Sequence, residues 1–211
     1  MMRSILTGGR RARLQLRWAC DSGQTLLEFA LVAPLVLLLM LGVIEVSYAL
    51  LDQHVVTKLT REGSNLISRD TSLADAANAI RSMSSRPLNF NDGSSKVIFS
   101  VVKKVATTGA PNYNKAVLYQ RYSYGTMSGS SILNNSGGSF GPSPEFQALN
   151  SDNDPSLQVS NVPATMALGG MLYITEIYTK HPLITPFNQF GVNFFGGPSM
   201  LPNTLYSIAY F

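Results

Sequence analysis

An apolar run at residues 23–51 constrains the fold of this chain more than any other feature. The run reads GQTLLEFALVAPLVLLLMLGVIEVSYALL and carries one carboxylate near its start, Glu28, and another near its end, Glu45. As an α-helix, residues 26–44 would span roughly 28 Å, close to the hydrocarbon thickness of a bilayer. The sequence therefore predicts a single membrane-spanning helix to which the rest of the chain is attached.

The basic charge of the chain lies almost entirely before this run. The formal net charge is +4, and the residues after 23 carry eleven basic and eleven acidic side chains. By the positive-inside rule, the N-terminus is expected in the cytoplasm and the C-terminal part outside, in the periplasm of a bacterium. A short basic segment of this kind is a topology signal, so no nucleic-acid partner is expected. The basic residues before the run are Arg3, Arg10, Arg11, Arg13 and Arg17.

Four regions are predicted along the chain. They are a cytoplasmic basic leader without regular structure (1–23), a transmembrane helix (24–51), an extracytoplasmic helical stalk (52–86) and an extracytoplasmic β-rich domain (87–211). Cys20, the one cysteine, lies in the leader, so the later domain has no disulfide and must fold on core burial alone.

The helical pattern extends past the membrane segment. Leu51, Val55, Leu59 and Leu66 lie in one sector of a helix, which predicts helix to about Ser68. A second helix is predicted from a capping box, in which Ser72 is followed three residues later by Asp75, and its apolar face holds Leu73, Ala76, Ala77, Ile80 and Met83. Pro87 ends this helix.

Beyond Pro87 the pattern is that of β-strands. Four segments rich in β-branched and aromatic residues, 96–105, 116–124, 171–179 and 204–211, predict a mostly antiparallel four-stranded sheet. One face should pack on the helix and the other should meet water. Between the second and third strands, 23 of the 35 residues at 127–161 are Ser, Gly, Asn, Pro or Asp, which predicts a long loop. The fold class is therefore α+β.

Three hypotheses account for the apolar run. It could be a secretory signal peptide cleaved after Ala49, although it is long for one and contains Glu28. It could be an uncut single-pass anchor with Glu28 and Glu45 at the two membrane interfaces. The third hypothesis starts from the residue order: a basic leader, Gly23, four residues, then Glu28 and Phe29 opening an apolar helix.

That order resembles the type IV prepilin signal. The resemblance implies that a prepilin peptidase cuts between Gly23 and Gln24 and leaves the apolar helix as the mature N-terminus. A carboxylate at the edge of an apolar helix costs a few kcal/mol unless a positive partner is supplied. Cleavage would supply one, because the new α-amino group of Gln24 on the same or a neighbouring subunit can pair with Glu28.

Further residues resemble one branch, the TadE-like pseudopilins, or minor pilins, of the tight adherence (Tad, or Flp) pilus. They include Pro34 and Glu45 within the run, the segment Thr60, Arg61, Glu62, Gly63, Ser64, and the strand with its tail MLYITEIYTKHPLITPF. The resemblance implies a type IV pilin-like fold and a structural role in assembling an adhesive pilus. The implied partners are the inner membrane, the prepilin peptidase, other pilins and pseudopilins, and the Tad assembly platform.

Two features of the helix have a structural interpretation of their own. Pro34 removes one backbone hydrogen bond, which loosens the preceding turn and could help a subunit leave the bilayer or simply suit packing there. Arg61 and Glu62 are adjacent and so do not face each other, which favours a solvated helix face over a partner on another subunit.

Catalysis is not expected. His54 and His181 are isolated, and no nucleophile motif or phosphate loop occurs. Asp152 and Asp154 fit an Asx turn before Pro155 better than a calcium loop, so no metal or cofactor is expected. Tyrosines could form an adhesive face: Tyr113, Tyr119, Tyr122, Tyr124, Tyr173, Tyr178, Tyr206 and Tyr210. The alternative function is a periplasmic domain on an uncleaved anchor, which binds a partner or surface ligand through the loop at 127–161.

Overall fold

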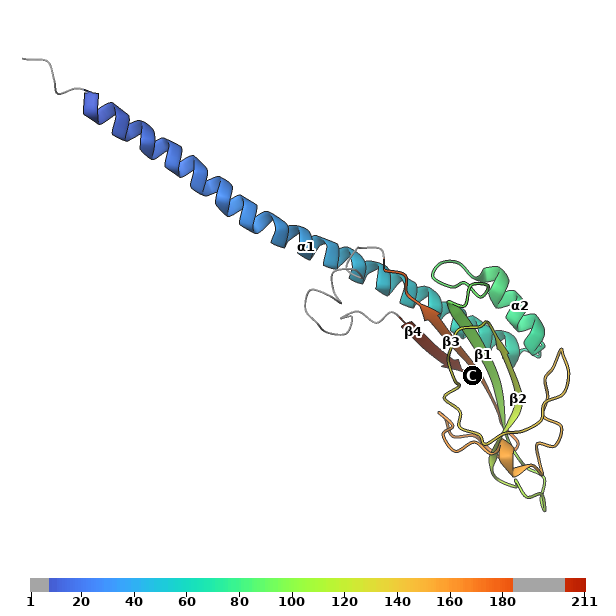
Figure 1. Cartoon of the computed structure of the whole chain (residues 1–211). Helices are drawn as coiled ribbons and strands as arrows, with labels where there is room; N and C mark the ends of the chain where they lie inside the picture. The colour runs from blue at the N-terminus through green and yellow to red at the C-terminus, as the bar shows by residue number, and fades with distance from the viewer. Residues whose placement is uncertain (1–7, 184–203) are drawn as a thin grey trace, which may run out of the picture. The chain divides into compact units, whose positions relative to one another are not determined.

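The computed structural model describes residues 8–183 and 204–211, with side chains described from residue 23 onward. Its elements are α1 (Gly8–Ser68), α2 (Leu73–Met83), β1 (Ser95–Lys104), β2 (Ala116–Tyr124), the short 3-10 helix η1 (Pro155–Leu157), β3 (Met171–Lys180) and β4 (Thr204–Tyr210) (Figure 1). The chain divides into two compact units, Met1–Ser47 and Tyr48–Phe211. The predicted α+β class, one long helix with a four-stranded antiparallel sheet, is confirmed.

The helix α1 begins earlier than predicted. Residues 8–22 were expected to lack regular structure, but α1 starts at Gly8 and runs 61 residues to Ser68. The leader is rich in Arg, Leu and Ala, which favour helix, and extending an existing helix costs far less than starting one. The predicted C-terminal end at Ser68 is confirmed.

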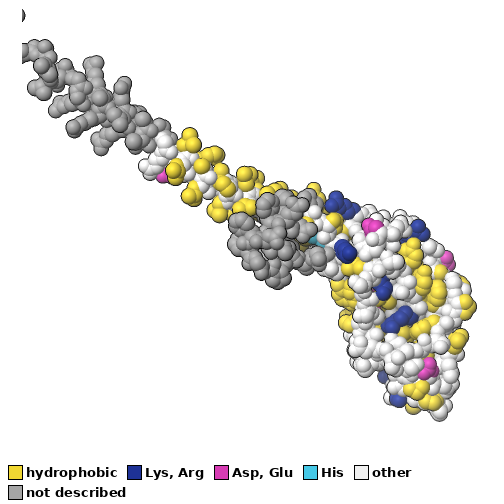
Figure 2. Space-filling view, in the orientation of Figure 1, with side chains coloured by type: hydrophobic (Ala, Val, Ile, Leu, Met, Phe, Trp, Pro, Cys, Tyr) yellow, Lys and Arg dark blue, Asp and Glu magenta, His cyan; other side chains and the backbone are white. Residues whose placement is uncertain are grey.

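In the first unit, the apolar side chains of α1 are exposed. Leu26, Phe29, Leu31 and Leu39 are each more than 60% exposed, and apolar side chains cover the visible face of this part of the helix in Figure 2. From Gly23 onward, the described helix is long and apolar enough to cross a membrane. Exposed apolar surface on all sides of a helix is typical of a membrane span.

In the second unit, all strands pair antiparallel in the order β2-β1-β3-β4. One face of the sheet packs against the last turns of α1 and against α2. Phe99, at the centre of that face on β1, is fully buried. The core on this face includes Val56, Leu59, Ile67, Leu73, Ile80, Val97, Val101 and Ile177.

The buried stripe of α1 differs from the predicted one. Val55 and Leu66 are half-buried and Leu51 is 56% exposed, whereas Asp52, Val56, Thr60, Gly63, Ser64 and Ile67 are buried with Leu59. The prediction was based on large apolar residues alone. Small and polar residues also occupy this stripe, because the helix lies close to the sheet.

The second helix and its cap are as predicted. The backbone N–H of Asp75 donates to Ser72 Oγ at 3.1 Å, and the Ser72 hydroxyl donates to the Asp75 carboxylate at 2.7 Å. Leu73, Ala76, Ala77 and Ile80 are buried, while Met83 is 43% exposed. The cap fixes the start of α2 and its apolar face covers the sheet.

The other face of the sheet does not meet water as predicted. The loop at 127–161 packs over it and buries a second core, which includes Val102, Val117, Leu118, Leu133, Ala148, Leu157, Val159, Leu172 and Ile174. Isolated β-bridges join the loop to β2, at Val117 with Gln158 and at Gln120 with Gln147. The loop is therefore the third layer of the domain.

Candidate functional site

The residues at the predicted cleavage site lie on an open part of α1. Gln24 Nε2 donates a hydrogen bond to Glu28 Oε1 at 3.1 Å, one helical turn away. Phe29 is 72% exposed. A Cβ atom added at Gly23 would meet no other atom within 4 Å. The first turns after Gly23 therefore present their side chains outward.

Two other predicted residues lie further along this part of the helix. The helix continues through Pro34 without a break. Glu45 is fully buried and has an interaction partner. Its burial sets it apart from Glu28, which is exposed.

The segment Thr60–Ser64 lies where α1 packs closely against the sheet. A Cβ atom at Gly63 would lie 2.8 Å from Thr175 Cγ2 and 3.2 Å from Phe99 Cε1, so the backbone here tolerates only glycine without a shift. Ser64 Oγ donates to the Ala209 carbonyl of β4 at 2.8 Å, and Thr60 Oγ1 donates to the Val56 carbonyl at 2.7 Å. The small residues of this segment thus form part of the contact between helix and sheet.

The charged residues of the same segment lie on the other side of the helix. Arg61 is exposed and Glu62 is half-buried. Together with His54, Lys58 and the C-terminal Phe211 they border an open pocket of about 530 Å³. As predicted from their adjacent positions, Arg61 and Glu62 do not pair, and both lie along the helix surface.

Residues 23–65 match the family model TadE, described as TadE-like protein. The match confirms the resemblance read from the sequence. It begins at Gly23, includes Glu28 and Pro34, and ends just after the Gly63 contact. It also indicates a membrane protein associated with a Tad pilus. No curated protein and no solved structure matches the chain. The second stretch of resemblance, residues 171–187, lies outside the matched range, and its last part, 184–187, lies outside the described residues.

One buried pair near the TadE-like segment was not predicted. His181, directly after β3, places its Nδ1 atom 2.7 Å from Asp52 Oδ2 on α1, and both side chains are buried. The pair ties the end of β3 to the helix. A signal was present in the sequence, because Asp52 precedes Val56, Leu59 and Gly63 on one helical stripe, where a carboxylate needs a partner.

A second unpredicted residue, Glu176 on β3, fixes the long loop to the sheet. Its buried carboxylate accepts hydrogen bonds from the Ser131 hydroxyl, from the Ile132 backbone N–H at 2.9 Å and from the Tyr206 hydroxyl at 3.0 Å. Burial and the neighbouring Glu176 charge raise the pKa of Tyr206, so this tyrosine stays a hydrogen-bond donor. Three donors satisfy the carboxylate where the loop crosses β3.

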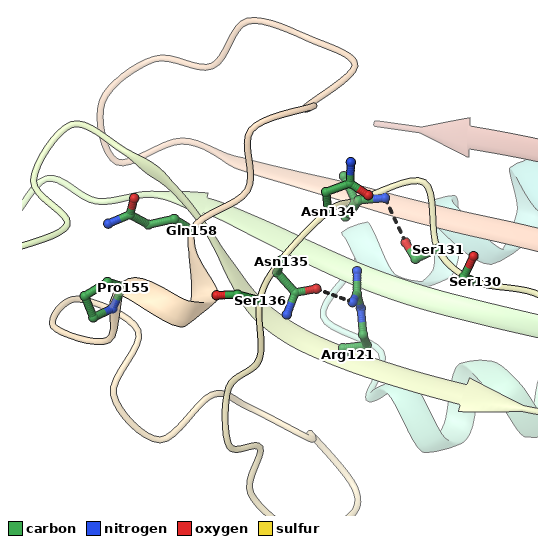
Figure 3. A pocket seen from close by; sticks show the side chains of 9 residues that line it. Arg121, Ser130, Ser131, Asn134, Asn135, Ser136, Pro155 and Gln158 are labelled. Atoms are coloured by element: carbon green, nitrogen blue, oxygen red, sulfur yellow. Dashed lines mark hydrogen bonds between the residues drawn. The ribbon is translucent and has the colours of Figure 1, made fainter.

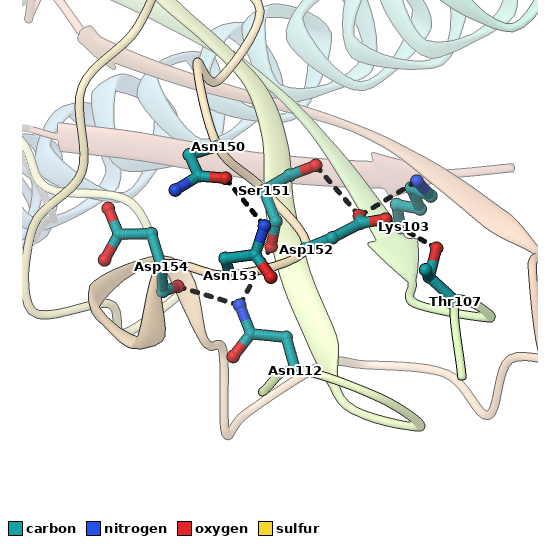
Figure 4. Close-up of polar contacts among 8 residues, drawn as sticks. All are labelled: Lys103, Thr107, Asn112, Asn150, Ser151, Asp152, Asn153 and Asp154. Atoms are coloured by element: carbon teal, nitrogen blue, oxygen red, sulfur yellow. Dashed lines mark hydrogen bonds and ion pairs between the residues drawn. The ribbon is translucent and has the colours of Figure 1, made fainter. Parts of the chain in front are cut away.

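The acidic stretch of the loop is a structural turn (Figure 4). Asp154 accepts a hydrogen bond from the Ser156 backbone N–H at 2.9 Å, which confirms the predicted Asx turn. Asp152 accepts from the Thr107 hydroxyl at 2.7 Å and lies 3.1 Å from Lys103 Nζ. These hydrogen bonds, that of Thr107 first, lower the pKa of the Asp152 carboxyl against the opposing effect of burial. Among the described residues, no His, Cys, Asp and Glu side chains gather as a metal site.

The tyrosines do not form one adhesive face. In the strand register, Tyr178 lies opposite Tyr206, whereas Tyr124 lies opposite Val97 on the helix-facing side of the sheet. The rings of Tyr178 and Tyr206 are 4.7 Å apart on the loop-covered side. The tyrosine side chains are therefore divided between the two faces.

Proposed function

We propose that this chain is a TadE-like minor pilin, a structural and non-enzymatic subunit needed to assemble a Tad-type adhesive pilus. The observation that carries the proposal is the helix within the matched residues 23–65, which exposes apolar side chains at 26–51 and then packs its small residues on the sheet. Such a helix can lie in a bilayer or in a bundle of like helices, while the domain at its C-terminal end is displayed outside.

Processing after Gly23 follows from the resemblance and fits the local geometry. A prepilin peptidase would cut between Gly23 and Gln24 on the cytoplasmic side of the inner membrane. The exposed Glu28 carboxylate accepts a hydrogen bond from the Gln24 side chain, and Gln24 would become the new N-terminus. The α-amino group of a neighbouring subunit would then neutralise Glu28 when helices bundle. Other pilins and pseudopilins and the Tad assembly platform would be the partners.

Mass spectrometry of the protein extracted from membranes tests the cleavage. We expect a mature N-terminus at Gln24 for the native chain and a full-length precursor for Gly23→Leu. The matched control is Gly42→Leu, because a Cβ atom at Gly42, as at Gly23, meets no other atom within 4 Å. A terminus at Leu50 would instead identify a signal peptide, and an uncut native chain would overturn the pilin proposal.

Loss of the charge at residue 28 tests the assembly role. We expect Glu28→Gln to abolish pili and adherence, because the pairing with a mature N-terminus is lost. Glu145→Gln removes one exposed carboxylate from the loop at 127–161 and should leave pili intact. Normal piliation in the Glu28→Gln strain would contradict the proposed pairing.

The second candidate is a periplasmic binding domain on an uncleaved anchor. One observation favours it: the loop at 127–161 borders a polar pocket together with Arg121 of β2. This candidate predicts that Gly23→Leu and Glu28→Gln leave both the size and the function of the protein unchanged. The two candidates therefore differ in the N-terminus and in the effect of both substitutions.

A further inference from the structure

The pocket beside Arg121 lies where the long loop crosses β2 (Figure 3). Its volume is about 690 Å³, within the range of small-molecule sites. Apart from Leu133 and Pro155, its walls are polar side chains. They are Ser130, Ser131, Ser136, Asn134, Asn135 and Gln158, and Arg121 is the one charged residue among them.

Arg121 has unused hydrogen-bonding capacity. Its Nε donates to Ser100 Oγ at 3.3 Å, and its Nη1 donates to Asn135 Oδ1 at 2.7 Å. Nη2 is buried and has no hydrogen-bond partner among the described residues. A guanidinium carries five N–H donors, and leaving a buried donor unpaired is costly. An acceptor that formed a hydrogen bond with Nη2 would therefore gain more binding free energy than an acceptor bound at the open surface.

Among the described residues, the charge of Arg121 also lacks a close partner. Glu176 acts on it electrostatically, but its carboxylate is already held by Ser131, Ile132 and Tyr206, and no ion pair joins Glu176 to Arg121 in the described part of the chain. Burial lowers the pKa of Arg121, and Glu176 opposes that effect only in part. A carboxylate from outside would form charge-assisted hydrogen bonds with the guanidinium.

We propose that this pocket binds an acidic saccharide, with the sugar carboxylate on Arg121 and its hydroxyl groups on the surrounding serine, asparagine and glutamine side chains. Each of those six neutral side chains both donates and accepts hydrogen bonds, as sugar hydroxyls do. A single guanidinium matches one carboxylate through two parallel bonds. The two bonds would come from Nη1 and Nη2, so the Asn135 amide must release Nη1 and the side chains that cover Nη2 must move aside when the carboxylate binds.

Calorimetric titration of the full chain tests this proposal. The protein is held in a zwitterionic detergent without a sugar headgroup, at low salt, and titrated with D-glucuronate and with D-glucose. We expect the dissociation constant for glucuronate to be at least tenfold lower, and tenfold corresponds to about 1.4 kcal/mol. Equal binding of the two sugars, or no binding of either, would overturn the proposal. So would an acidic tripeptide that displaces glucuronate at lower concentration.

Three variants locate the site. Arg121→Gln should abolish glucuronate binding, and Lys115→Gln, which removes the same charge from an exposed residue elsewhere, should leave it unchanged. Arg121→Gln also removes the hydrogen bonds to Ser100 and Asn135, so a second variant is needed. Ser136→Trp keeps Arg121 and fills the pocket with a large side chain, and it should abolish binding as well. Binding that survives both Arg121→Gln and Ser136→Trp would exclude this pocket.

Discussion

At the residue scale, Gly63 controls how closely α1 approaches the sheet. In an open helix, replacing glycine by alanine gains about 1 kcal/mol. At Gly63 the added methyl group would lie 2.8 Å from Thr175 Cγ2, and Thr175 is fully buried and cannot move aside freely. We expect Gly63→Ala to lower the free energy of unfolding by about 1–3 kcal/mol, as overpacking does, in denaturant titrations of the full chain.

Gly42→Ala is the control for Gly63→Ala, since it makes the same substitution in the same helix with free space around the new atom. It should leave stability unchanged or raise it. If both alanine variants were equally stable, the close approach of helix to sheet at Gly63 would be wrong.

Also at the residue scale, Asp152 makes stability depend on pH. Hydrogen bonds from Thr107 and Lys103 lower its pKa in the folded chain, so its contribution is present above the ordinary aspartate pKa of about 3.9 and is lost as the pH falls through the lower folded value. We expect Asp152→Asn to melt at a lower temperature than the native chain at pH 7. The difference in melting temperature should shrink below about pH 4.

Asp70→Asn serves as the comparison, because Asp70 is exposed. Its melting temperature should differ little from the native value across the same pH range. If the melting temperature of Asp152→Asn stayed below the native value by the same amount down to acid pH, the charge of Asp152 would not be what stabilises the fold.

At the element scale, the start of α2 depends on one cap. Ser72 accepts the Asp75 N–H and is itself buried, so Ser72→Ala removes the cap without opening a large cavity. We expect a loss of about 1 kcal/mol in the free energy of unfolding, measured by denaturant titration. Ser82→Ala changes an exposed serine within the same helix and should have little effect. Equal losses in the two variants would contradict the capping role.

Elements with a strong local pattern were predictable and the contacts between distant elements were not. The Ser72 and Asp75 signature gave the start of α2, and β-branched runs gave all four strands within one residue of their observed ends. Local spacing could not show that Thr60, Gly63 and Ser64 form the buried stripe, because their burial follows from how near the helix lies to β3 and β4. For the same reason, Asp52 with His181 and Glu176 with Ser131 were missed, since each pair joins residues distant in sequence.

The long loop shows the same limit. Its Ser, Gly and Asn content correctly predicted irregular backbone, but not that Leu133, Leu157 and Val159 would bury one face of the sheet. A few apolar residues spaced through a polar segment have no periodicity for a pattern to detect. The position of Arg121 at a pocket also depends on this packing, so only the structure could reveal it.

At the scale of the whole molecule, residues 48–211 form a compact unit with two cores of their own. The core on the helix side requires Val56, Leu59 and Ile67 from α1. We therefore expect a fragment of residues 48–211 to be soluble without detergent and to unfold cooperatively in circular dichroism. A fragment of residues 69–211 would expose that core face and should aggregate or lack a cooperative transition, because burying this apolar surface supplies much of the folding free energy. If the shorter fragment folded as stably as the longer one, the last turns of α1 would be a tether rather than part of the domain.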